Sequence, residues 1–411
     1  MNIQRFQEDF CAIAQFGVLN NGGVTRLAFT KEDMDARNYL IEVMRSARLQ
    51  VTIDPVGNIR GLRVGRNPKL SSVMIGSHLD TVPHGGHYDG VVGVLAALET
   101  VRSLNDADIE TERSIEVVNF SAEESSRFGM ATIGSKAMTG KLKVSQLRTL
   151  TDDSGENLYQ ILKKSGHNVD EMPQAVVTSD NIYAYLELHI EQGPVLENEQ
   201  RNVGIVSAIA APSRFNVHIK GRSDHSGNTP MTMRRDALAG AAEIVLGVET
   251  IALHGGANTV GTVGALTVRH GAMNIVPGSV DLSIDIRDTN LEDKSKAVDN
   301  LNLLLTEIAD RRKLDIQTTI LCNDTPVQLS KKIAQQLCQH AQQLQLNCKT
   351  MPSGAGHDAM HFTSIAPTGL IFIPSINGVS HSIEEKSSLE DICNGVKLLH
   401  KTALTLANDV P

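Results

Sequence analysis

The stretch KLSSVMIGSHLDTVPHGGHYDGVVGVLAALETVRSL, residues 69–104, decides the fold. It begins with a short, nearly continuous apolar run, which is typical of a strand covered on both faces in a mainly parallel sheet. It ends in residues 89–104, whose apolar positions wrap around a helix of the kind that packs on such a sheet. A strand followed at once by a packing helix indicates an α/β protein.

Three more segments contain an apolar run of the same kind. They are SIEVVNFSAEE at 114–124, IYAYLELHIEQG at 182–193 and TGLIFIPSI at 368–376. Because continuous apolar runs of this length suit buried parallel strands, we expect all of them in one mainly parallel sheet with helices on both faces.

The middle of the chain has a different pattern. RFNVHIKG at 214–221 and SVDLSIDIRD at 279–288 alternate strictly between apolar and polar residues, as strands of an antiparallel sheet with one wet face do. Helical stretches at 230–253 and 291–312 separate the strands and predict a β-α-β-β-α-β order of the ferredoxin-like kind. We therefore expect an inserted α+β domain at 211–326 and a main α/β domain formed by 1–210 and 327–411.

Composition excludes several functions. With 411 residues, 41% hydrophobic and 21% charged, the chain suits two globular domains. A net charge of −9 without a basic block argues against a nucleic acid partner, and no apolar run is long enough for a membrane span. The five scattered cysteines include no CxxC pair, which fits a reducing compartment and excludes a thiolate zinc cage. With no secretory signal at the start, we expect a cytoplasmic protein.

Acidic and imidazole side chains follow the predicted strands, where α/β sheets build their sites. Taken singly, a histidine after a strand is more often structural, and a Glu-Glu pair is usually solvated surface. Seven such residues after four apolar strands favour a common site. They are His78, Asp80, Asp89, Glu123, Glu124, His189 and His381.

These residue types indicate a metal site. Divalent ions of borderline softness bind imidazole nitrogen and carboxylate oxygen, and a pair of ions needs a shared anionic ligand. A spare glutamate beside a glutamate ligand can serve as the general base that takes a proton from water. We therefore expect two divalent metal ions, zinc first, with manganese, cobalt and nickel as alternatives.

The sequence resembles the hydantoinase/carbamoylase branch of the M20 family of metallopeptidases and amidases. The resemblance implies a catalytic α/β domain with two zinc- or manganese-like ions, and a smaller lid domain through which subunits form a homodimer. The matching stretches run through nearly the whole chain: GGVTRL, GSHLDTVPHGGHYDG, SAEESSRFG, ELHIEQGPVLE, GRSDHSGNTPM, GAMNIVPG, SIDIRD, SGAGHDAM and SINGVSH.

The resemblance also implies a role for each donor. One ion would have two histidines as its terminal ligands, the other a glutamate and a histidine, with an aspartate as the bridge. A further aspartate would orient a ligand histidine, and a glutamate would be the general base. His78 and His189 would be the terminal ligands of the first ion, and Glu124 and His381 those of the second. Asp89 would be the bridge between them. Asp80 would orient His78, and Glu123 would be the general base.

Residues outside the sheet edge have implied roles as well. His225 resembles a lid histidine that reaches the neighbouring subunit's active site and hydrogen-bonds the oxyanion; the alternative is a turn histidine that only caps its loop. Asn274 and Arg287 resemble the lid pair that binds the substrate carboxylate, although Arg287 could instead form a surface salt bridge. Three weaker candidates for substrate contact are Gly356, His357 and Gln192.

The branch contains N-carbamoyl-L-amino acid hydrolases, β-ureidopropionases and allantoate amidohydrolases, which all act on small ureido carboxylates. Pro212 stands where allantoate enzymes have a glutamine, and RFGMATIGSKAMTG at 127–140 is similar to carbamoylases. IPSINGVSH at 373–381 is instead more similar to allantoate enzymes. The balance favours an N-carbamoyl-L-amino acid hydrolase.

Two rival functions remain. An aminoacylase or dipeptidase would cut an ordinary amide, and a non-catalytic scaffold would keep only the fold and the metals. Glu123 argues against the scaffold, because a binding protein needs no base. One departure from the branch is Ile383 where proline is common, which could move the loop that holds His381.

Overall fold

The computed structural model describes residues 1–410, which form two compact units. Unit 1 comprises Met1–Ser207, Leu329–Met351 and His357–Pro411, and unit 2 comprises Ala208–Gln328 and Pro352–Gly356. Unit 2 thus extends the predicted insertion by a few residues at each end. The short segment 352–356, expected in the main domain, belongs to unit 2 because its backbone carbonyls accept hydrogen bonds there, for example from Ala210.

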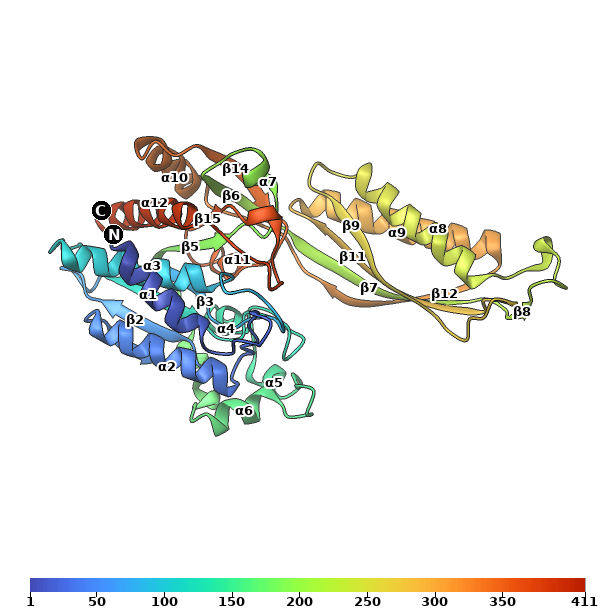
Figure 1. The fold of residues 1–411 in the computed structure, drawn as a ribbon, viewed down its shortest axis with the longest axis horizontal. Helices are drawn as coiled ribbons and strands as arrows, with labels where there is room; N and C mark the ends of the chain where they lie inside the picture. The colour runs from blue at the N-terminus through green and yellow to red at the C-terminus, as the bar shows by residue number, and fades with distance from the viewer. Residues whose placement is uncertain (411) are drawn as a thin grey trace. The chain divides into compact units, whose positions relative to one another are not determined.

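Unit 1 is built on a sheet with a parallel centre. The strand order is β1-β2-β4-β3-β5-β15-β6-β13, and β14 pairs with β6. The four central strands β4, β3, β5 and β15 run parallel to one another, whereas β1, β2, β6 and β13 pair antiparallel. The central strands are the four apolar segments identified in the sequence, so the predicted mainly parallel sheet is confirmed (Figure 1).

The strands of this sheet are β1 Gln50–Ile53, β2 Ile59–Arg63, β3 Ser72–His78, β4 Ile115–Phe120, β5 Ile182–Ile190, β6 Val203–Ile209, β13 Val327–Gln328, β14 Cys348–Ser353 and β15 Thr368–Ile373. The helices of unit 1 are α1 Ile3–Ala14, α2 Lys31–Ser46, α3 Val91–Asp106, α4 Ile133–Met138, α5 Val144–Leu147, α6 Leu158–Lys164, α7 Val195–Asn198, α10 Lys331–Gln343, α11 Ala359–Phe362 and α12 Leu389–Ala407, with 3-10 turns at Val169–Ala175 and Ile376–Gly378.

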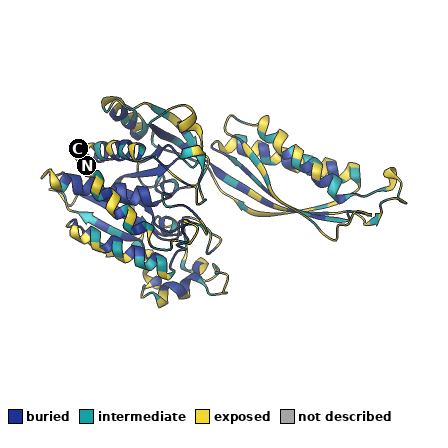
Figure 2. Cartoon of the chain, in the orientation of Figure 1, coloured by how far each residue is buried: buried dark blue, intermediate teal, exposed yellow. Residues whose placement is uncertain are grey.

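Helices cover both faces of the parallel centre. On one face α1, α2, α3, α10 and α12 form the main apolar core with alternate residues of the strands. On the other face Phe362 of α11 stacks on Tyr185 of β5 at 4.4 Å between ring centroids and also contacts Phe120 of β4. Figure 2 shows the central strands buried, as strands covered on both sides must be.

Helix α3 begins next to His78 at the end of β3, and a glycine allows the chain to turn into the helix there. Gly90 precedes α3 with φ +66°, and a Cβ there would lie 2.5 Å from the His78 ring. Only glycine adopts this backbone without strain and leaves room for the imidazole. Asp89 is therefore fixed at the positive end of a buried helix, next to the end of β3.

Unit 2 has an antiparallel sheet of strand order β12-β7-β11-β9. Helices α8 and α9 lie side by side along one face (Figure 1). The predicted β-α-β-β-α-β order is thus confirmed, although α8 begins at Ala237 rather than near Pro230, because the Asp236 side chain caps it there. The elements are β7 Ala211–Lys220, β8 Asp224–His225, α8 Ala237–Leu253, β9 Val260–Val268, β10 Ile275–Val276, β11 Ser279–Asp288, α9 Leu291–Arg312 and β12 Asp315–Asn323, with a 3-10 turn at Met231–Met233.

Within residues 1–410 no helix combines the length and the apolar character that crossing a bilayer requires.

Candidate metal centre

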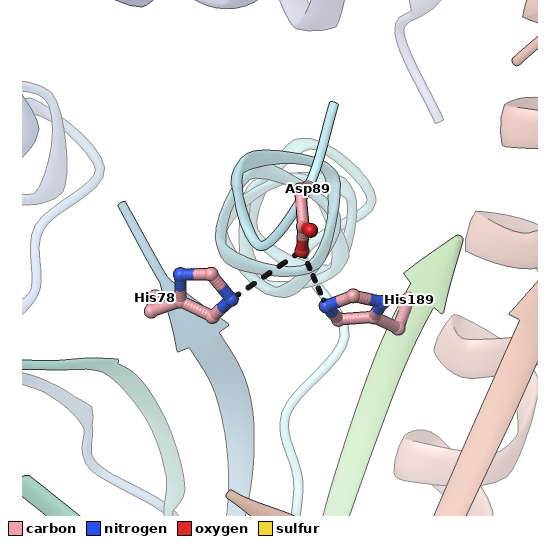
Figure 3. A group of neighbouring side chains, drawn as sticks. All are labelled: His78, Asp89 and His189. Atoms are coloured by element: carbon pink, nitrogen blue, oxygen red, sulfur yellow. Dashed lines mark ion pairs between the residues drawn. The ribbon is translucent and has the colours of Figure 1, made fainter. Parts of the chain in front are cut away.

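Asp89 lies between two histidines from neighbouring strands. His78 ends β3 and His189 lies near the end of β5, and both imidazoles point at the Asp89 carboxylate from opposite sides (Figure 3). Asp89 Oδ1 is 3.6 Å from His78 Nε2 and 2.9 Å from His189 Nε2. All three side chains are buried. They form one group of donors within 4.8 Å of one another.

The other oxygen of Asp89 faces a second group. His381 Nε2 is 3.1 Å from Asp89 Oδ2 and 3.2 Å from Glu124 Oε1. These three residues also lie within 4.8 Å of one another. One carboxylate thus presents Oδ1 to a pair of histidines and Oδ2 to a histidine and a glutamate, which is the arrangement that a bridging ligand between two ions requires.

Hydrogen bonds fix the tautomers of the two buried histidines. Nδ1–H of His78 donates to the backbone carbonyl of Asp80, and Nδ1–H of His189 donates to that of Ile190, each at 2.9 Å. In the neutral ring the Nε2 lone pair then faces the Asp89 carboxylate. A lone pair and an anion repel each other unless a cation lies between them, so the donor set fits divalent metal ions.

The pKa values reflect the same crowding of negative charge. Burial lowers the pKa of His78, but Glu123 and Asp89 outweigh burial and raise it well above 6.5. Hydrogen bonds with Asp89 and Glu124 raise the pKa of His381 to about 11. Without metal, protons must therefore neutralise the site, and a bound cation takes their place.

Glu123 lies beside the first group without belonging to either. Its Oε2 is 3.7 Å from His78 Nε2. Burial is the larger cause, and the negative charge of Glu124 a smaller one, that together raise the pKa of Glu123 well above 4.5. A buried carboxylate with a raised pKa is suited to accept and return a proton.

The structure corrects the expected contact of Asp80. Its carboxylate was expected to orient His78 but lies 3.8 Å from Nδ1, and the carbonyl of Asp80 accepts that hydrogen bond instead. The carboxylate accepts the backbone N–H groups of Glu123 and Glu124, at 3.2 and 3.0 Å. Asp80 therefore holds both glutamates as well as the histidine. Burial raises the pKa of Asp80 to about 6.

The three weaker candidates lie in different places. Gln192 has φ +59°, and its amide donates to Asp89 Oδ2 at 2.7 Å. His357 is buried with its ring against that of His189, at 4.6 Å between centroids. Gly356 ends the short segment of unit 2 that precedes His357. Gln192 and His357 thus touch candidate ligands.

His225 and Asn274 come together in unit 2. His225 in β8 pairs with Ile275 in β10, and the carbonyl of Asn274 accepts the N–H of Ser226. Nδ1 of the exposed His225 accepts the N–H groups of Gly227 and Asn228. The imidazole does cap its loop, as the alternative reading held, and the same bonds leave Nε2–H as its free donor.

Arg287 lies on the open face of the unit 2 sheet. Its Nε and Nη2 donate to the two oxygens of Asp285, each at 3.0 Å, and Nη1 donates to the carbonyl of Gly354 at 2.9 Å. A guanidinium has five N–H groups, so one remains on each terminal nitrogen. The salt bridge expected as an alternative is present, yet it leaves a fork that fits a carboxylate.

Sequence reasoning missed two buried carboxylates. Glu385 accepts hydrogen bonds from the loops that contain Asp89 and His381. The only sequence feature that could have identified it is its position four residues after His381. Glu187 lies on β5 two residues before His189 and forms a third donor group with His189 and His357. Its oxygens accept bonds from Ser77 and the Ala359 N–H.

The parallel sheet and the paired donor groups at its edge define the class of metal-dependent hydrolases. Residues 74–405 match the model of peptidase family M20/M25/M40, and the chain belongs to this family.

Curated relatives match over almost the whole chain. An N-carbamoyl-L-amino-acid amidohydrolase of Pseudomonas sp. strain NS671 is 40% identical over 95% of both chains. A ureidoglycolate hydrolase of Arabidopsis thaliana is 37% identical over 98% of this chain and 86% of its own. An allantoate amidohydrolase of Escherichia coli K12 is 34% identical over 96% of both.

A solved structure extends the comparison to the fold. A hydantoinase/carbamoylase family amidase from Burkholderia multivorans has a TM-score of 0.93 and 32% identity, and covers 100% of this chain and 99% of its own. The resemblance to this branch is confirmed. The chain is accordingly a hydrolase of carbon–nitrogen bonds in linear amides other than peptide bonds.

Removal of metal should make stability depend on pH. The pKa of His381 in the metal-free fold is about 11, above the 6.5 of an unfolded histidine, so its contribution is complete below pH 6.5 and is lost as pH rises toward 11. Metal binding strengthens over the same range. We expect the Tm difference between metal-loaded and chelator-treated protein to widen from pH 6.5 to 9.5 in thermal scans. A difference that is constant or narrows would contradict this assignment.

Proposed function

We propose that the protein is an N-carbamoyl-L-amino acid hydrolase with two divalent metal ions, zinc first, in each subunit. It cleaves the ureido carbon–nitrogen bond and yields the L-amino acid, carbon dioxide and ammonia. The observation that carries the proposal is the division of the Asp89 carboxylate between two adjoining donor groups, with Glu123 beside them. A scaffold protein needs no such base.

Each donor has a role in this proposal. His78 and His189 hold one ion, Glu124 and His381 hold the other, and Asp89 bridges them. When bound, the ions would supply Lewis-acid polarisation of the ureido carbonyl and would lower the pKa of water. Glu123 takes a proton from this water and returns it to the leaving nitrogen. The carbamate that leaves the amino acid then decomposes to carbon dioxide and ammonia.

Arg287 supports a substrate with a carboxylate. Its two remaining N–H groups, one on each terminal nitrogen, match the two oxygens of a carboxylate. Pro212 is the residue opposite Arg287 on β7 and therefore lies on the same face of the sheet. Proline has no side-chain amide, which favours a carbamoyl amino acid over allantoate at this position.

The distances within unit 2 support an active site made by two subunits. Arg287 is near one end of β11, whereas the β8–β10 ribbon with His225 and Asn274 lies beyond the other end, before Ser279 (Figure 1). The eight residue steps of strand from 279 to 287 span about 26 Å. A small substrate cannot reach both ends, so His225 and Asn274 act on the substrate that Arg287 of the other subunit binds.

An unprotected sheet edge supports a homodimer through unit 2. Strand β9 is an edge strand without a single charged residue, and edges of this kind usually pair unless charges block them. Helix α8 packs beside β9 and exposes Leu246 and Leu253, two turns apart. A second copy that continues the sheet across β9 would cover these side chains.

A second candidate is hydrolysis of allantoate or a related ureido acid. The segment IPSINGVSH at 373–381 favours it, because this segment is more similar to allantoate enzymes and ends in the candidate ligand His381. β-Ureidopropionase shares the same machinery and remains a weaker alternative. Aminoacylase and dipeptidase activities are weaker still.

Ammonia release distinguishes these substrates. Metal-loaded protein is compared on N-carbamoyl-L-methionine, N-carbamoyl-β-alanine, allantoate and ureidoglycolate at equal concentration, and N-acetyl-L-methionine and a dipeptide are assayed by amine release. We expect the highest kcat/KM for N-carbamoyl-L-methionine, because Arg287 holds its carboxylate and Pro212 provides no amide for allantoate. Turnover of allantoate alone would show that segment 373–381, rather than Pro212, indicates the substrate.

Glu123→Gln should separate chemistry from metal binding. The amide keeps the size of the side chain but cannot accept the proton, so we expect kcat to fall by about 100- to 10,000-fold. Metal content and Tm should stay near wild type, because Glu123 belongs to neither donor group. The exposed Glu171→Gln is the control. The measurements are steady-state kinetics and metal analysis of both variants. An unchanged kcat of Glu123→Gln would exclude Glu123 as the general base.

Subunit mixing tests the two-subunit site. His225→Ala and Arg287→Ala should each be nearly inactive. After the two are mixed and allowed to exchange, half of the dimers are mixed and each has one intact site, so about a quarter of wild-type activity should return. His225→Ala mixed with Asn274→Ala should stay inactive, because the two changes of a mixed dimer then fall on different sites and leave neither intact. Equal recovery in both mixtures would contradict the arrangement.

A further inference from the structure

Glu385 makes four hydrogen bonds to two loops that are distant in sequence. Its Oε1 accepts the backbone N–H groups of Tyr88 and Asp89, each at 3.0 Å. Its Oε2 accepts the Ser380 hydroxyl at 2.9 Å and the His381 N–H at 3.2 Å. The side chain is 3% exposed, and 296 residues of sequence separate it from Asp89.

These bonds determine where two metal-ligand candidates stand relative to each other. Asp89 and His381 lie on separate loops, and the same carboxylate accepts the backbone N–H of both. His381 also has φ +54°, a left-handed backbone that a residue with a side chain adopts only when its surroundings hold it there. Glu385 supplies one of the bonds that hold it.

Local packing is adapted to this carboxylate. Gly86 lies so close to Glu385 that any Cβ at this position would overlap the glutamate side chain. A buried charge is costly unless it is well hydrogen-bonded, and here each oxygen has two donors. The side chain of Ile383, two residues before Glu385, lies against Gly23, which has no side chain of its own.

We propose that Glu385 is a positioning residue that sets the separation of Asp89 and His381 and thereby forms the ion site that these two residues share with Glu124. It touches neither the substrate nor the ions. This assignment rests on the proposed metal centre and adds a residue that holds one of its two sites selectively. His78 and His189 stand on strands β3 and β5 and do not depend on Glu385.

The variant Glu385→Gln tests this role with little change of shape. The remaining oxygen still accepts from Tyr88 and Asp89, while the new NH₂ faces the His381 N–H, and two donors cannot bond each other. The serine hydroxyl can rotate and accept instead. The His381 loop should therefore be released while the Asp89 loop stays in place.

The experiment is a Co²⁺ titration of the metal-free full-length protein, followed by visible absorption. We expect wild type to bind two ions, and Glu385→Gln to bind the first with unchanged affinity and the second about 10- to 100-fold more weakly, as when partners of metal ligands are lost elsewhere. Excess Co²⁺ should restore kcat with KM unchanged. Glu384→Gln, at the exposed neighbour, should bind both ions normally.

Glu116→Gln is the control for general loss of stability, because Glu116 is a buried carboxylate that pairs with Arg60 near the start of β4. It should lower Tm without weakening the second ion selectively. The proposal would be overturned if Glu385→Gln bound both Co²⁺ ions with wild-type affinity. It would also be overturned if the affinity for both ions fell equally, with a matching loss of Tm. Wild type that binds no Co²⁺ would instead refute the metal centre, and this assignment with it.

Discussion

The position of the Asp89 carboxylate is the constraint on which the rest of the structure depends. Its two oxygens face different donor groups. A shift of the carboxylate by about one ångström would bring it closer to one group and remove its oxygen from the other. The parallel sheet brings His78 and His189 to one edge, and the start of α3 holds the aspartate between them. The positive end of that helix also favours the negative charge of Asp89. The fold thus provides a rigid frame for one anion.

The electrostatics of the site link stability to function. The carboxylates of Asp80, Asp89 and Glu123 are buried beside imidazoles, and burial alone disfavours their charged forms. The cost of burying the Asp80 carboxylate is offset in part by the two backbone N–H groups that donate to it, which add no further charged side chain to the site. The remaining negative charge needs cations. The negative charge that destabilises the metal-free protein is therefore the same charge that would attract metal ions.

The sequence was sufficient to predict the central strands, the ferredoxin-like order of unit 2 and the meeting of the donors at one edge, because apolar runs and alternation are local patterns and parallel strands end at one edge. The division of the donors into two groups was implied by the family resemblance. It was insufficient where long-range contacts decide. No local pattern links Glu385 to Asp89, or shows that the carbonyl of Asp80 rather than its carboxylate accepts from His78. Segment 352–356 joins unit 2 through hydrogen bonds to Arg287 and Ala210 that only the folded chain forms.

The separation of residues within unit 2 has a consequence for specificity. The candidate ion ligands and Glu123 lie in unit 1. Relatives named for different substrates are similar to this chain over nearly its whole length, so differences between their substrates should arise mainly from residues that hold the rest of the substrate molecule. Arg287 and Pro212 lie at one end of the unit 2 sheet, and His225 and Asn274 lie beyond the other. If one substrate uses both ends, a change in the pairing of two copies alters its pocket as directly as a side-chain substitution does. In the proposed homodimer, association of subunits would then be part of substrate recognition as well as a source of stability.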